Sequence, residues 1–277
     1  MNGSESTPYL SLLRNQIDVT RVPFSDRGSR LLIHQHANSS KLYIKLAERI
    51  MGLEPGLEAY LQRKPFIDNL ALIDKDGNEL EFSIVTSPQA LYFQTSIGEF
   101  GVVFQDLRTI SVGIPVDQTA GICFQVRPVV WYNSDVGGEL KSIRNFGYNS
   151  NGDIVKNQIS PQNGTYQVEV IVQGGQDRAI TLHVNPTLDV SHETLPFSEA
   201  QDHAYKRWRE WFGSIPPVDE PYRKTYAYAW WIMANNLISP LGNVAFEAMT
   251  PSKTSYIGLW LWDSALHALA YRYIDPE

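Results

Sequence analysis

The stretch Tyr166-Gln-Val-Glu-Val-Ile-Val172 alternates polar and apolar residues along most of its length. Alternation at period two predicts a β-strand that buries one face. Comparable short runs recur through the first two thirds of the chain, at 30–35, 41–46, 91–94, 101–104, 109–112, 122–126 and 179–184. Residues 70–83 predict a hairpin, because an Asp-Gly pair lies between two β-prone runs. Many short strands separated by Gly, Asn, Asp and Pro predict an antiparallel β-sandwich over residues 1–194.

The pattern changes to helical spacing after residue 195. Residues 195–217 predict a linker helix with Ser198 as its N-cap, ended by Gly213 and the Pro216-Pro217 pair. A second helix is expected from Asp219 to Leu237. A third is expected to start at Asp263 and to turn its apolar side chains inward, namely Leu266, Leu269 and Tyr273. The long connection of residues 239–262 is rich in apolar residues, and connections of that length are usually functional.

Composition narrows the functional classes. The formal net charge is −7 and no basic cluster occurs, which argues against a nucleic-acid partner. The N-terminal residues show no signal peptide, and no run reaches the about 18 apolar residues that a membrane span needs. The single cysteine, Cys123, is expected to be a buried apolar residue. We therefore expect a soluble, cytoplasmic protein.

One segment contains a candidate catalytic residue: Trp260-Leu-Trp-Asp-Ser-Ala-Leu-His267. Asp263 would lie beside the positive end of a helix, which favours the carboxylate, and between tryptophans, which favour the neutral acid. A general acid needs the neutral form. The alternative is that Asp263 only caps the helix, since Asp is a preferred N-cap residue. Six of the seven tryptophans follow residue 200, which suits a sugar site but also suits a helical core.

This segment closely resembles the Trp-x-Trp-Asp-Ser-x-x-His signature of six-hairpin glycosidases, with glycoside hydrolase family 63 and the bacterial glucosylglycerate, mannosylglycerate and debranching-type glycosidases as the nearest relatives. The segments Met249–Lys253 and Pro23–Arg30 are similar to other parts of these proteins. The resemblance implies that residues 218–277 open an (α/α)6 barrel that is truncated here. It implies Asp263 as the general acid and inversion of the anomeric centre, with a Glu base in a later hairpin. Glu247 lies in the same loop, but no family reason makes it the base.

Further candidates surround Asp263. Trp260 and Trp262 would stack on sugar rings, and Tyr256 and Lys253 would hydrogen-bond sugar hydroxyls or a carboxylate. Trp230 and Asn235 would line the cavity from the preceding helix, and His267 would bond within the core. No metal or other cofactor is expected. The rival hypotheses are a carbohydrate-binding or interaction protein that works through the sandwich, and a lyase or phosphorylase on the same barrel. The oligomeric state, sugar, linkage and aglycone stay open.

Overall fold

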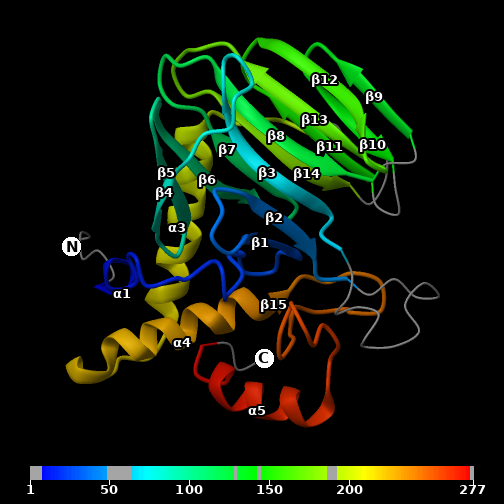
Figure 1. Cartoon of the computed structure of the whole chain (residues 1–277). Helices are drawn as coiled ribbons and strands as arrows, with labels where there is room; N and C mark the ends of the chain where they lie inside the picture. Colours follow the sequence, from blue (N-terminus) through cyan, green and yellow to red (C-terminus); the bar gives the residue numbers. More distant parts are fainter. Residues whose placement is uncertain (1–7, 49–63, 128–129, 142–144, 186–191, 275–277) are drawn as a thin grey trace.

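The computed structural model describes residues 8–48, 64–127, 130–141, 145–185 and 192–274. Two antiparallel sheets lie face to face (Figure 1). One sheet has the order β1-β2-β3-β8-β13-β12, with strands at Leu31–Gln35, Leu42–Leu46, Ile67–Asp74, Ala120–Val126, Thr165–Val172 and Ile154–Gln162. The other has the order β4-β5-β6-β7-β14-β11-β10-β9, with strands at Ser83–Thr86, Ala90–Thr95, Gly98–Asp106, Thr109–Gly113, Ala179–Asn185, Asn145–Ser150, Gly137–Lys141 and Val130–Ser134. The predicted antiparallel β-sandwich is confirmed.

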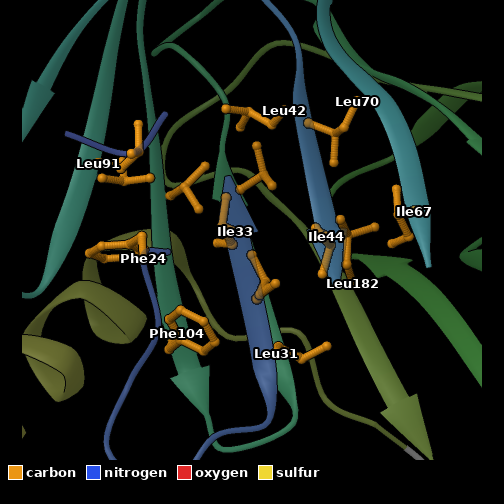
Figure 2. Close-up of a cluster of buried hydrophobic side chains, with 14 of the residues drawn as sticks. Phe24, Leu31, Ile33, Leu42, Ile44, Ile67, Leu70, Leu91, Phe104 and Leu182 are labelled. Carbon is orange, nitrogen blue, oxygen red and sulfur yellow. The ribbon is translucent and has the colours of Figure 1, made fainter. Parts of the chain in front are cut away.

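The main core fills the space between the sheets. Figure 2 shows Leu31 and Ile33 of β1, Phe104 of β6 and Leu182 of β14 among the buried side chains of this core. Phe24 precedes β1 and is 1% exposed, and its backbone bonds to Ile33 in both directions. The residues directly after Phe24 are thereby fixed to the sandwich. Cys123 is buried, as expected.

Helix α3 (Phe197–Ser214) packs on the outer face of the eight-stranded sheet. Its Ala200 and Ala204 lie against Ala90 and Val103. The ring of Phe197 lies over two glycines: a Cβ on Gly101 or Gly113 would come within 2.3 or 2.4 Å of it. The predicted linker helix is therefore packed on the sandwich. Pro196, not Ser198, occupies the N-cap, without a side-chain cap hydrogen bond.

The other face of α3 builds an aromatic layer with the following helices. Trp208, Trp211 and Phe212 pack with α4 (Arg223–Asn236), which follows the 3-10 turn Glu220–Tyr222. The short helix α1 (Pro8–Leu12) packs against both α3 and α4. Strand β15 (Leu237–Ile238) pairs with β16 (Ala248–Met249), and α5 (Leu261–Tyr271) follows. Within the described ranges, none of the helices has the length and apolar character needed to cross a bilayer.

Several local predictions were wrong. The second arm of the hairpin at 70–83 forms only an isolated bridge between Ile73 and Glu79, and β4 joins the other sheet, where it pairs with β5. Helix α5 begins at Leu261 instead of Asp263. Its predicted inward residues are exposed instead, by 61% for Leu266, 55% for Leu269 and 60% for Tyr273. The side that packs against the core carries Ala270 and Tyr271.

Candidate active site

Asp263 lies in the first turn of α5, three residues after the N-cap position. Trp260 is the N-cap, and no side chain makes a capping hydrogen bond there. Asp263 therefore does not cap the helix, and that alternative interpretation is wrong. Its side chain is partly exposed and is not hydrogen-bonded to any other residue that the structure describes. Asp263 is partly exposed to solvent and lies near the positive end of the helix.

Three aromatic residues near Asp263 are exposed. The exposed fractions are 46% for Trp260, 75% for Trp262 and 49% for Tyr256. Trp260 has an extended backbone, whereas Trp262 belongs to the first turn of α5. Neither tryptophan packs inward. These three rings could stack on a sugar.

Lys253 and Trp230, also predicted to touch substrate, are both buried. Lys253 is 1% exposed, and its Nζ donates to Ser25 Oγ at 3.2 Å and to the Asp26 carbonyl at 3.3 Å. Trp230 is 5% exposed and lies against Trp211 and Tyr271. Burial favours a structural role for both side chains over contact with a ligand.

Asn235 is buried and His267 is partly exposed. Asn235 of α4 is 4% exposed, and the residues described provide no hydrogen-bond partner for its amide group. His267 lies one turn after Asp263, where burial lowers its pKa and the charge of Asp263 opposes that shift. The hydrogen bond expected of His267 is not seen at Nδ1, which meets no partner among the described residues.

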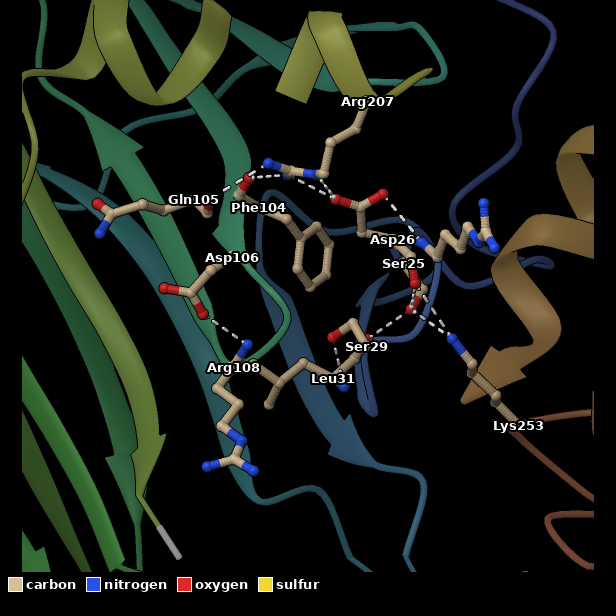
Figure 3. Close-up of polar contacts among 11 residues, drawn as sticks. Ser25, Asp26, Ser29, Leu31, Phe104, Gln105, Asp106, Arg108, Arg207 and Lys253 are labelled. Atoms are coloured by element: carbon tan, nitrogen blue, oxygen red, sulfur yellow. Dashed lines mark hydrogen bonds and ion pairs between the residues drawn. The ribbon is translucent and has the colours of Figure 1, made fainter. Parts of the chain in front are cut away.

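Lys253 belongs to a buried charge cluster that the sequence did not reveal (Figure 3). Arg207 of α3 donates to Asp26 Oδ2 through Nε at 2.9 Å and through Nη2 at 2.6 Å, and also to the carbonyls of Phe104 and Gln105. Burial raises the pKa of Asp26, and the charge of Arg207 opposes that shift. Burial lowers the pKa of Lys253 to about 7. The sequence signals for the cluster were the positions of Asp26 in the segment Pro23–Arg30 and of Lys253 in the segment Met249–Lys253.

A second ion pair lies beside this cluster. Arg27 donates to Glu247 through Nε at 3.0 Å and through Nη2 at 2.6 Å, a two-point contact. The Arg27 guanidinium also lies 5.1 Å from the centre of the Trp211 ring. Glu247 is therefore held by a cation of the sandwich.

The described residues contain no group of three or more His, Cys, Asp or Glu side chains arranged to hold a metal ion. The arrangement as a whole offers one accessible carboxyl group with exposed aromatic neighbours. That combination suits acid catalysis on a ligand that stacks on rings.

No protein-family profile and no curated protein sequence matches the chain. Among solved structures, it is similar to the family GH92 inverting mannosidase BT2199 of Bacteroides thetaiotaomicron, with a TM-score of 0.56 and 8% identity over 90% of this chain. A putative kojibiose phosphorylase from the human microbiome also matches, with a TM-score of 0.44 and 12% identity over 79% of this chain and 40% of that one. The chain spans 44% of the length of the mannosidase. The mannosidase match shows a shared fold, a β-sandwich followed by helices.

Proposed function

We propose that this chain forms the β-sandwich and the first helices of an inverting glycoside hydrolase that acts on α-linked glucosides or mannosides, of the oligosaccharide or glycosylglycerate type. The observation that carries the proposal is the placement of Asp263. It lies in the first turn of α5, partly exposed, and directly follows the segment that contains the exposed Trp260 and Trp262. The likeness in fold to an enzyme described as an inverting mannosidase supports the same class.

Each exposed residue then has a defined role. Asp263 protonates the leaving oxygen of the glycosidic bond. Trp260, Trp262 and Tyr256 hold the sugar, because the C–H faces of a pyranose ring pack on aromatic rings.

The general base is proposed to lie in barrel hairpins outside this chain. Glu247 is the other carboxylate of the loop, and both of its oxygens accept hydrogen bonds from Arg27. In inverting enzymes the two carboxyl groups lie about 6.5–9.5 Å apart, so that a water molecule fits between them.

The surface of α5 supports the proposal that further helices pack there. None of its residues is buried, and Leu261 and Leu266 are exposed by 92% and 61%. A contiguous apolar surface of this kind usually belongs to an interface. In the proposed barrel the next hairpins would cover it.

The test is hydrolysis of a panel of α-linked glucosides, mannosides and glycosylglycerates by the longest natural form of the protein. Wild type and Asp263→Asn are compared, and the anomer of the product is followed by NMR. We expect an inverted product, and a loss of about 10²–10⁴-fold in the variant, the usual contribution of a general acid.

The other outcomes are distinct. Equal activity of the two proteins would remove Asp263 from the chemistry. A product that retains the anomeric configuration would contradict the inverting mechanism. Binding of sugars without turnover by either protein would favour the carbohydrate-binding alternative.

A further inference from the structure

A short segment of the sandwich, residues 25–30, makes backbone hydrogen bonds to the chain just after α4. Gly28 N donates to the Leu237 carbonyl at 3.0 Å, and Ser239 N donates to the Gly28 carbonyl at 2.9 Å. Arg30 Nη2 adds a bond to the Ser239 carbonyl at 2.9 Å. Gly28 has a φ of 76°, which favours glycine, and a Cβ there would come within 3.1 Å of Leu107. These hydrogen bonds, and the need for glycine at residue 28, fix the position of segment 25–30 against β15.

The same segment also holds the loop that follows, residues 239–260, through side chains. Arg27 makes the two-point contact with Glu247, and Ser25 and Asp26 accept hydrogen bonds from the buried Lys253. The pairing of β15 with β16 and a bond from Thr250 N to the Asn236 carbonyl join residues 236–238 to residues 248–250 of the loop. Segment 25–30 thus contacts the loop at Ser239, Glu247 and Lys253.

Segment 25–30 is itself fixed. Phe24 anchors it in the core, and Asp26 is bound to Arg207 of α3. The sandwich and α3 therefore form a rigid base for the loop.

Asp263 follows ten residues after Lys253, and its own helix is lightly held. The C-terminal part of α5 is held by Tyr271, whose hydroxyl donates to the Met233 carbonyl at 3.0 Å. The first turn, with Asp263, has only exposed or partly exposed side chains. The position of Asp263 therefore depends on the loop that leads to it.

We infer that segment 25–30 of the sandwich positions Asp263, with Arg27 and Lys253 as positioning residues that hold the 239–260 loop. The inference rests on the proposed function, because it concerns the acid of the same reaction. The sandwich then contributes to catalysis by holding the loop in place, without contact with the substrate.

The test is a charge swap at Arg27 and Glu247, whose side chains are 46% and 32% exposed and so tolerate reversal. The longest natural form is compared with Arg27→Glu, Glu247→Arg and the double variant Arg27→Glu/Glu247→Arg. The matched control is the swap at Lys41 and Glu79, an ion pair of similar exposure on the sandwich. Steady-state kinetics give kcat and KM, and hydrogen exchange with mass spectrometry follows the amides of residues 239–262.

We expect each single reversal at Arg27 or Glu247 to lower kcat by about 10–100-fold, the cost of displacing a catalytic group by about 1 Å. KM should change much less, and loop amides should exchange faster. The double variant should recover most of kcat and of the protection. The control variants should match wild type in all these measurements.

Three results would overturn the inference. The first is single variants with wild-type kcat and exchange. The second is a loss that the double variant does not recover, since Glu247 would then act in its own right. The third is an equal loss in the Lys41 and Glu79 variants. If wild type proves inactive on every substrate, the proposed function fails, while faster exchange that the swap reverses still supports positioning of the loop.

Discussion

Lys253 Nζ donates a hydrogen bond to Ser25 Oγ at 3.2 Å, although the two residues are 228 positions apart. The lysine comes from the loop that leads to Asp263, and the serine from the segment that enters the sandwich. Lys253 is 1% exposed, so its ammonium group has lost its contact with water. Removal from water destabilises the charged form of the lysine. The free energy of unfolding should therefore depend on whether Lys253 is protonated.

The first prediction is a pH dependence of the free energy of unfolding that depends on Lys253. Burial lowers its pKa in the folded state to about 7, against 10.5 for the free side chain. Between these values the unfolded chain binds more protons, so stability should rise with pH across the window. Replacement by an uncharged residue, Lys253→Met, should remove this rise, which can reach at most about 1.4 kcal/mol per pH unit. Urea unfolding at pH 7.5 and 9.5 measures the difference.

The control for this measurement is Lys75→Met. Lys75 is fully exposed, and its hydrogen bond to Asp76 raises its pKa instead of lowering it. That variant should keep the wild-type rise. If the free energy of unfolding rises with pH equally in wild type and in Lys253→Met, the buried Lys253 does not cause the rise, and the prediction is wrong.

The second prediction concerns the ion pair of Asp26 and Arg207. Arg207→Met leaves the buried carboxyl of Asp26 without its main cation, at a cost of about 3 kcal/mol at neutral pH, the lower end of the range for a broken buried pair. A third of the Arg207 side chain, 33%, is exposed, which is why we choose the lower end. Because burial raises the pKa of Asp26 and Arg207 opposes that shift, the variant should carry a further raised pKa. Its loss of stability should therefore shrink as pH falls toward 4 and Asp26 becomes protonated.

The double variant Asp26→Asn/Arg207→Met separates charge from packing. It should be more stable at pH 7 than Arg207→Met alone, because position 26 then no longer holds a buried carboxylate that lacks its main cation. Thermal unfolding at pH 5 and 7 gives the comparison. A double variant that is less stable than both single variants would mean that packing dominates at this site.

The third prediction concerns the contact of α3 with the sheet. A Cβ on Gly113 would come within 2.4 Å of the Phe197 ring, so Gly113→Ala should cost about 1–3 kcal/mol, as overpacked sites do. Adding Phe197→Ala should cost less than the sum of the two single changes. Gly213→Ala is the matched control, because Gly213 lies in α3, the helix of Phe197, and a Cβ built there would have nothing within 4 Å. This variant should be neutral or stabilising by about 0.5 kcal/mol. Additive losses in the double variant would contradict the contact.

The sandwich and the three main helices could be predicted from local patterns, because alternation and helical spacing reflect burial within one element. Strands β4, β9, β10, β11 and β12 were missed. Strands β10 and β12 contain Gly137, Gly138 and Pro161, residues that also mark turns, and each pairs with a strand that is its neighbour in the sequence. Side-chain pairing across the sheet, not local preference, makes them strands.

The candidate site was predicted in part. The segment that contains Asp263 was found from a local signature, whereas the buried cluster of Asp26, Arg207 and Lys253 joins residues 181 and 227 positions apart, which no local pattern encodes. The orientation of α5 was wrong for a related reason. Leu266 and Leu269 were assumed to face the core, but the structure packs the opposite side through Tyr271.

The last prediction uses these exposed leucines to test the proposed barrel. In the chain of 277 residues, Leu266 and Leu269 are 61% and 55% exposed, so Leu266→Ala and Leu269→Ala should change stability by no more than about 0.5 kcal/mol. In a natural form that carries the proposed barrel helices, the same side chains would be buried, and each replacement should cost about 2–5 kcal/mol. Leu72→Ala, in the sandwich core with 0% exposure, should cost that much in both forms and serves as the control. Chemical unfolding of each variant in both forms gives the comparison. If the α5 variants stay neutral in the longer form while Leu72→Ala does not, the apolar surface of α5 is not covered by the same chain, and the barrel would have to be assembled differently.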